Sequence, residues 1–268
     1  MSPNDLSQTG WALLAGLAAV VLTMAVTYVW ARRTGLLSVV DTVWGLGFVP
    51  VAVASTAVSL AGGGDALTRW LLLGLTTVWA VRLGTHVHRR NHGKGEDPRY
   101  RDVLERHPDR GFGQTAVRSV LGPQGLGMYV VAAPLMVGPQ NEGHVTWLVV
   151  LGVAVWAVGL FFETVGDRQL EVYKRDPAHR GQVMDTGLWR YTRHPNYFGD
   201  ACVWWGLGLV AASSWPGVVA LLGPAVMTYS LVNVTGAKLN EQGQQRKPGW
   251  ASYARRTSYF VPLPPRKG

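Results

Sequence analysis

The residue types best suited to chemistry gather between residues 181 and 200, directly before an apolar run of the chain. The polar side chains around Pro195 are Arg193, His194, Asn196 and Tyr197. Pro195 can occupy the first position of a helix, where free backbone N–H groups attract an anion, and Arg193 adds a positive charge beside them. We therefore predict an anion-binding site here; the alternative is a basic and aromatic belt at a membrane surface.

Two acidic residues lie upstream of this segment. Glu163 and Asp167 are four residues apart, so a helix would place both on one face. Carboxylates so close to an apolar run are costly unless they face a polar cavity, which favours a role in the site. The alternative is that each pairs with a neighbouring cation such as Arg168 or Lys174.

A third polar cluster follows the last apolar run. It begins with Lys238, Asn240 and Glu241 and continues through the aromatic and basic residues 250–262. This cluster predicts either a contribution to a cofactor site or a basic tail that lies on lipid headgroups.

Asp41 lies within the second apolar run. An intramembrane carboxylate is a functional hypothesis by default, so we predict a catalytic or substrate-orienting role for it. It could instead face water at the end of the run, or form a structural ion pair with Arg82.

Histidines and the single cysteine offer little for a metal. His86, His88 and His92 follow one another closely, but residues 86 and 88 do not share a helix face. Cys202 is alone, which excludes an intrachain disulfide and a multi-cysteine metal site. We predict no metal site.

The elements that must position these residues are long apolar segments. Of the 268 residues, 48% are hydrophobic and 15% are charged, against about 25% charged in a typical soluble domain. Crossing a bilayer takes about 20 apolar residues. The clear runs are 11–30, 36–60, 66–82, 145–162 and 218–235, and the weaker ones are 126–138 and 198–214. The sequence therefore predicts an all-α integral membrane protein with seven transmembrane helices.

The basic residues predict the orientation of these helices. With the N-terminus outside, the inward loops and the tail hold 23 of the 25 lysine and arginine residues, as the positive-inside rule demands. The exceptions are Arg69 and Arg82. We predict one multi-pass domain over residues 1–268 in the cell membrane, with a cytoplasmic C-terminus. Loops 89–119 and 167–196 and the tail 237–268 would form its working side.

The net charge of +9 fits basic loops against anionic headgroups better than nucleic-acid binding. No glycine-rich dinucleotide fingerprint, phosphate-binding loop or nucleophile elbow is present. A nucleotide would therefore bind within the helical bundle and its loops. The expected partners are membrane lipids and an apolar small-molecule substrate.

Three sequence blocks together resemble the steroid 5-alpha-reductase superfamily, and in particular its bacterial multi-pass branch. The blocks are Phe162–Leu170, Gly187–Gly199 and Tyr253–Pro262, and Asp41-x2-Trp44-Gly45 and Arg99-Tyr100 also fit. The resemblance implies a seven-helix fold that binds NADPH on the cytoplasmic side and reduces a carbon–carbon double bond in an apolar substrate.

The resemblance also implies roles for single residues. Asp167 and Asn196 match residues that contact the cofactor, and Glu163 stands where those enzymes have an asparagine. Lys174 and Lys238 fall where basic residues lie near the cofactor phosphates. Arg193, His194, Tyr197 and Glu241 complete the expected cofactor site.

On the substrate side, the reductases grip a ketone with a Glu–Tyr pair. Asp41 would replace that glutamate, and Trp79 stands at the tyrosine position. Indole donates a hydrogen bond but is not a phenolic acid. The resemblance therefore implies an unsaturated lipid other than a steroid enone.

A second resemblance leads to a different enzyme class. Isoprenylcysteine carboxyl methyltransferases and phospholipid methyltransferases also carry Arg-His-Pro-x-Tyr before a span and a glutamate after the next one. Residues 193–197 and Glu241 match that pattern, which would imply S-adenosylmethionine as the cofactor. A non-enzymatic lipid-binding membrane protein is the third alternative.

Overall fold

The computed structural model describes residues 3–266, with side chains from residue 7 onward, and the described chain is almost entirely helical. Its one isolated β-bridge joins Thr192 to Ser258 in parallel. The chain forms two compact units. Unit 1 comprises residues 1–149 and 209–223, and unit 2 comprises residues 150–208 and 224–268. The prediction of a single membrane domain stays a prediction.

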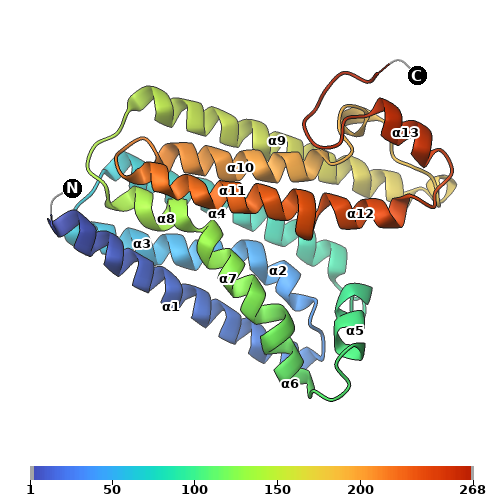
Figure 1. Cartoon of the computed structure of the whole chain (residues 1–268), viewed down its shortest axis with the longest axis horizontal. Helices are drawn as coiled ribbons and strands as arrows, with labels where there is room; N and C mark the ends of the chain where they lie inside the picture. Colours follow the sequence, from blue (N-terminus) through green and yellow to red (C-terminus); the bar gives the residue numbers. More distant parts are fainter. Residues whose placement is uncertain (1–2, 267–268) are drawn as a thin grey trace. The chain divides into compact units, whose positions relative to one another are not determined.

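Figure 1 shows the helices in chain order. Those of unit 1 are α1 (Pro3–Thr34), α2 (Val39–Leu46), α3 (Phe48–Gly62), α4 (Ala66–Asn91), α5 (Pro98–Glu105), α6 (Phe112–Thr115), η1 (Ala116–Leu121), α7 (Gly122–Val131), α8 (Ala133–Val137), η2 (Gly138–Gln140) and η5 (Gly217–Leu221). Those wholly or mainly in unit 2 are α9 (Thr146–Arg175), η3 (Pro177–His179), η4 (Gly187–Arg190), α10 (Pro195–Ala211), α11 (Leu222–Tyr229), η6 (Ser230–Val234), α12 (Ala237–Gln244) and α13 (Trp250–Arg256).

Within the described residues, four helical stretches are long and apolar enough to cross a membrane. They are Ser7–Thr34, Val39–Gly62, Thr146–Arg175 and Gly217–Gln244. A bent pair, Phe112–Val131 and Ala133–Gln140, would add a fifth span despite its 51° break. These helices indicate a membrane protein.

Two predicted spans are not among these stretches. Helix α10 has 17 residues, fewer than the approximately 20 that a straight span needs. Helix α4 has 26 residues but carries Arg69, Arg82 and a basic last turn. Seven spans and the outside position of the N-terminus therefore stay predictions.

The lipid-facing character of α1 follows from its exposed side chains. Trp11, Val21, Leu22 and Val26 are each more than half exposed, although they are large and apolar. Exposed apolar surface on this scale marks a partner or a membrane. The opposite side of α1 packs on α3 and α7.

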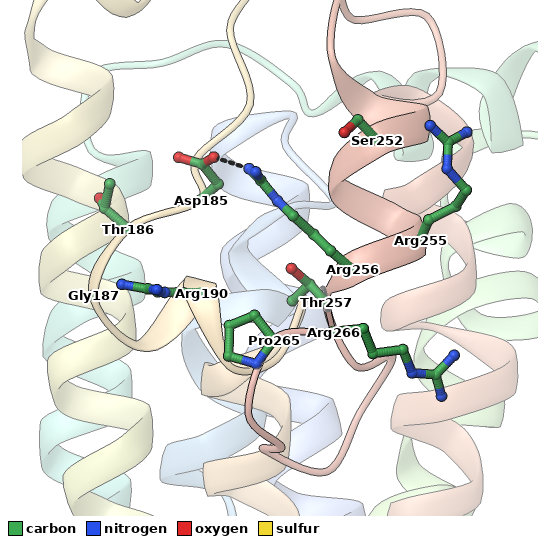
Figure 2. A pocket seen from close by; sticks show the side chains of 10 residues that line it. All are labelled: Asp185, Thr186, Gly187, Arg190, Ser252, Arg255, Arg256, Thr257, Pro265 and Arg266. Carbon is green, nitrogen blue, oxygen red and sulfur yellow. Dashed lines mark hydrogen bonds and ion pairs between the residues drawn. The ribbon is translucent and has the colours of Figure 1, made fainter. Parts of the chain in front are cut away.

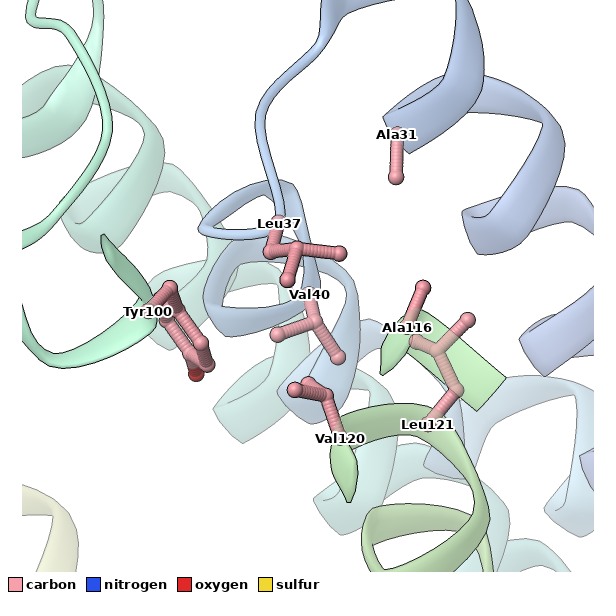
Figure 3. Close-up of a cluster of buried hydrophobic side chains, with 7 residues drawn as sticks. All are labelled: Ala31, Leu37, Val40, Tyr100, Ala116, Val120 and Leu121. Atoms are coloured by element: carbon pink, nitrogen blue, oxygen red, sulfur yellow. The ribbon is translucent and has the colours of Figure 1, made fainter. Parts of the chain in front are cut away.

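The core of unit 1 near α2 and α5 is a buried apolar cluster, shown in Figure 3. Its members are Ala31, Leu37, Val40, Tyr100, Ala116, Val120 and Leu121. Because Tyr100 belongs to this cluster, the loop after α4 is anchored by apolar burial as well as by its polar contacts.

Arg69 was an exception to the predicted charge distribution, and its surroundings explain it. The side chain is buried, and its Nε donates to Ser59 Oγ at 2.9 Å. Its Nη2 donates to the carbonyl oxygens of Ser59, Gly63 and Gly64 at 3.3, 3.1 and 3.1 Å. Arg69 therefore holds the α3–α4 turn together, and its charge is satisfied inside the protein.

Glycines let α9 and α10 approach closely in unit 2, where the two helices lie side by side (Figure 1). A Cβ on Gly199 would lie 2.4 Å from Glu163 N and 2.6 Å from Gly159 O, and one on Gly159 would lie 2.5 Å from Gly199 O. Small residues at such crossings are typical of packed membrane helices. This contact brings the Glu163–Asp167 face of α9 beside the start of α10.

Candidate functional site

The first part of the candidate site joins α9 to the start of α10. Asn196 Nδ2 donates a hydrogen bond to Asp167 Oδ1 at 3.1 Å, and Asn196 Oδ1 accepts one from Tyr197 N at 3.1 Å. Asp167 is buried, and Glu163, one turn earlier, is only 2% exposed. The two carboxylates therefore share the α9 face that meets α10, as predicted from their spacing.

The second part is centred on Glu241 of α12. Arg193 Nε and His194 Nε2 both lie 3.1 Å from the same oxygen, Glu241 Oε1. For a hydrogen bond to this carboxylate, Nε2 of His194 must carry the proton. The structure thus brings Glu241 to two neighbouring predicted site residues, of which His194 is 47 positions earlier in the chain.

Aromatic rings surround this ion pair. The Arg193 guanidinium lies 5.1 Å from the ring centroid of Tyr259 and 5.9 Å from that of Trp250. The His194 ring stacks on Tyr197 with centroids 5.6 Å apart. Burial is the largest influence on Tyr259 and raises the pKa of its phenol, as does Glu241, while Arg193 opposes them. The rings hold the charged groups in place and offer flat surfaces to a ligand.

The remaining predicted cofactor residues lie on α12 and α9. Asn240 Nδ2 donates to the hydroxyl of Tyr197. Lys238 is exposed in the first turn of α12, and Lys174 is exposed in the last turn of α9. All nine predicted cofactor residues therefore belong to unit 2. Their role in binding stays a prediction.

Asp41 lies in unit 1 and has two donors. Its Oδ1 accepts a hydrogen bond from Tyr100 Oη at 2.5 Å, and its Oδ2 pairs with Arg99 Nη2 at 2.8 Å. Gln124 Nε2 donates to the same phenol oxygen at 3.3 Å. Burial and then the charge of Asp41 raise the pKa of Tyr100, so this phenol keeps its proton at neutral pH.

Sequence reasoning did not assign Tyr100 to the site. The dipeptide Arg99-Tyr100 was noticed only as part of a resemblance, because nothing local links it to a residue 59 positions earlier. The structure supplies a phenol beside Asp41 where the sequence offered only Trp79.

Trp79 lies in the core of unit 1. It is fully buried, and its ring centroid is 5.9 Å from that of Phe48. A catalytic role for Trp79 stays a prediction.

Groups of three or more histidine, cysteine, aspartate or glutamate side chains that could hold a metal ion are absent from residues 3–266. The His88 and His92 rings lie 5.3 Å apart.

Comparison with known proteins places the chain in a family. Residues 27–257 match the model of the family described as "protein of unknown function (DUF1295)", and the chain belongs to that family. A 62-residue stretch is 39% identical to the probable O-methyltransferase ustE of Ustilaginoidea virens. That match covers 23% of this chain and 21% of ustE, so it extends over about a fifth of the relative. No solved structure matches the chain.

Proposed function

We propose that the protein is an NADPH-dependent reductase of a carbon–carbon double bond in a lipid or another apolar substrate. It would act in the cell membrane through seven spans, with loops 89–119 and 167–196 and the tail 237–268 on the cytoplasmic side. The observation that carries the proposal is the charge of unit 2, which has 13 lysine and arginine residues against seven acidic ones. Most of the chain's net +9 thus belongs to the unit that contains the candidate cofactor residues.

This charge favours one cofactor over the other. NADPH carries three phosphate groups and is strongly anionic, whereas S-adenosylmethionine carries a sulfonium and an ammonium against one carboxylate. Lysine and arginine side chains bind phosphate groups through charge-assisted hydrogen bonds, and they repel a cation. A basic unit therefore suits NADPH better.

The residues of unit 2 also fit the remainder of such a cofactor. Arg193, Lys174 and Lys238 would neutralise phosphates, and Asp167 and Asn196 would accept from and donate to ribose hydroxyl and carboxamide groups. NADPH, when bound, would supply the hydride that adds to one carbon of the double bond.

Unit 1 contains a phenol–carboxylate pair that could orient the substrate. Reduction of a double bond requires one proton on the second carbon or on a conjugated carbonyl oxygen. Tyr100 keeps its phenolic proton beside Asp41, and the guanidinium of Arg99 balances the charge of that carboxylate. A raised pKa makes Tyr100 a weak acid, so this arrangement supports a role for Asp41 and Tyr100 in orienting the substrate.

Cofactor binding tests the proposal directly. The full-length protein in detergent is titrated with NADPH and separately with S-adenosylmethionine while its thermal unfolding is followed. NADPH at 100 times its dissociation constant should stabilise the protein by about 2.7 kcal/mol. A shift with S-adenosylmethionine and none with NADPH would overturn the proposal, and a shift with neither would favour a lipid-binding protein without enzymatic activity.

Two variants test the residues. Asp167→Asn removes the charge of the acceptor and Asn196→Asp removes the donor of the observed pair, so each should weaken NADPH binding by about tenfold or more, since a hydrogen bond to a charged group contributes about 1.5–3 kcal/mol. Asp109→Asn, at an exposed position of unit 1, makes the same charge change as the first variant and serves as its control. Unchanged NADPH binding in both variants would remove this pair from the cofactor site.

Methyl transfer is the second candidate, because the stretch similar to ustE comes from a protein named as a probable O-methyltransferase. The Arg193–Glu241–His194 arrangement is compatible with that chemistry as well. The S-adenosylmethionine arm of the titration decides between the two cofactors.

A further inference from the structure

The C-terminal segment of unit 2 forms a pocket that contains none of the residues assigned to the cofactor. This arginine pocket has a volume of about 930 Å³ and is shown in Figure 2. Its walls are Asp185, Thr186, Gly187, Arg190, Ser252, Arg255, Arg256, Thr257, Pro265 and Arg266. Four guanidinium groups and one carboxylate line it, so its local charge is strongly positive.

The walls are fixed by hydrogen bonds between distant parts of the chain. Arg193 N donates to Ser258 O at 2.9 Å, and Leu263 N donates to Tyr191 O at 3.0 Å. The buried hydroxyl of Tyr253 donates to Trp189 O at 2.6 Å. These bonds hold the tail against the segment before α10, so the pocket is formed without a ligand.

The arginines of the pocket are incompletely neutralised. Arg256 pairs with Asp185, as Figure 2 shows. Within residues 3–266, no carboxylate forms an ion pair with the other three guanidinium groups, those of Arg190, Arg255 and Arg266. Like charges gathered in one cavity repel one another, and an anion would relieve that repulsion.

The chemistry of the walls selects the type of anion. Guanidinium groups form paired hydrogen bonds to phosphate oxygens, and the hydroxyls of Thr186 and Ser252 are additional donors. Apolar side chains of the same tail, Val261 and Leu263, are more than half exposed, and Tyr191 beside Arg190 is also exposed. A phosphate group next to exposed apolar surface is what a phospholipid presents at the membrane boundary.

We propose that the arginine pocket binds a phosphate group, and that an acidic phospholipid headgroup is its source. Bound phosphate would contact the guanidinium groups of Arg190 and Arg255 and would compete with Asp185 for Arg256. The pocket is thus a second anion site of unit 2, separate from the predicted cofactor residues. It fastens the C-terminal segment to the lipid surface.

The test uses the full-length protein in neutral detergent micelles. Phosphatidylglycerol, phosphatidylcholine or inorganic phosphate is added, and binding is followed by native mass spectrometry and thermal unfolding. Phosphatidylglycerol should bind and stabilise the wild-type protein more than phosphatidylcholine does. The variant Arg190→Gln/Arg255→Gln should weaken phosphatidylglycerol binding by about tenfold or more, because each basic side chain near an anionic lipid contributes to the binding free energy. Both side chains are exposed, so the substitutions should leave the fold intact.

A matched control removes the same charge elsewhere. Arg101→Gln/Arg106→Gln alters two exposed arginines in and directly after α5 of unit 1 and should change phosphatidylglycerol binding by less than about twofold. Equal losses in both variants would show a general charge effect and overturn the proposal, as would unchanged binding in the pocket variant. Binding of inorganic phosphate but not of phosphatidylglycerol, lost only in the pocket variant, would uphold the phosphate site and overturn its lipid source.

The NADPH titration separates this inference from the proposed function. The pocket variant should retain the NADPH-induced stabilisation of the wild-type protein. Loss of that stabilisation together with lipid binding would mean that the pocket holds cofactor phosphates, and the proposal of a second site would be wrong. Absence of any NADPH effect in the wild-type protein would contradict the reductase proposal alone.

Discussion

Glu96 in unit 1 and Glu241 in unit 2 are both partly buried glutamates, but they interact with different kinds of groups. Glu96 Oε2 accepts from Leu37 N at 2.5 Å, and Oε1 accepts from Ser38 N and Asp97 N at 2.9 and 3.1 Å. Glu241 uses one oxygen, Oε1, for two side chains, Arg193 and His194. Backbone donors are fixed by the fold, whereas side chains can turn to a ligand.

This difference separates a structural carboxylate from one suited to function. Glu96 fastens the loop before α5 to the start of α2, and both its oxygens are engaged. Glu241 orients a guanidinium and an imidazole that an anionic ligand could also contact. Asp41 is intermediate, because its donors are side chains while Tyr100 also belongs to the apolar cluster.

The largest expected effect is on stability, from the same substitution at both glutamates. Glu96→Gln places an amide NH₂ against backbone N–H donors whichever way it turns, and should cost about 3 kcal/mol. Glu241→Gln can keep its oxygen toward His194 Nε2 and near Arg193 Nε, and should cost less than about 1 kcal/mol. Chemical unfolding in detergent measures both values. Equal losses of unfolding free energy would contradict the proposed difference between Glu96 and Glu241.

The two glutamine substitutions should rank in the opposite order in their effect on NADPH binding. Glu241→Gln weakens the hold on Arg193 and His194 and should change the stabilisation that NADPH produces, whereas Glu96→Gln should leave it unchanged. An effect of Glu96→Gln on NADPH alone would contradict this assignment.

A smaller effect is expected for the intermediate case. Asp41→Asn, Tyr100→Phe and the double variant form a mutant cycle around the 2.5 Å hydrogen bond. The coupling free energy should be about 1.5 kcal/mol, because the bond is charge-assisted and partly buried. Phenylalanine retains the packing of the ring, so the cycle isolates the polar contact. Additive losses would show that the two side chains do not act as a unit.

The smallest expected effect depends on pH. Asp65 caps α4 by accepting from Thr68 N at 2.8 Å, and it lies 3.0 Å from His144 Nδ1. Burial alone would raise the pKa of Asp65, but the hydrogen bonds from Thr68 and His144 outweigh it and the pKa is lowered.

A lowered folded-state pKa means that this carboxylate stabilises the fold above the unfolded pKa, and that the contribution is lost as the pH falls through the folded value. Unfolding free energy measured from pH 7 to below about pH 4 should therefore decrease by about 1 kcal/mol more in the wild-type protein than in Asp65→Asn. Parallel pH curves for the two proteins would contradict the role of this cap.

Local sequence was sufficient to predict where the long apolar helices lie, because hydropathy and helix breakers act over short distances. The apolar run 11–30 lies within α1, and the run 145–162 begins at the residue before α9 and otherwise lies within that helix. The weak run 126–138 contains Pro134, and the structure breaks there between α7 and α8. The four-residue spacing of Glu163 and Asp167 likewise predicted their shared face.

The partners of the polar side chains were decided by tertiary structure. Asp41 meets Tyr100 across 59 residues, and Arg193 and His194 meet Glu241 across about 48. Hydropathy records which residues avoid water, but it does not record which turns bring distant segments together. The tail, which the sequence offered as a basic surface or a cofactor contact, forms the wall of an arginine pocket for the same reason. The sequence by itself determined a helical membrane protein, and only the path of the chain decided which charges lie together.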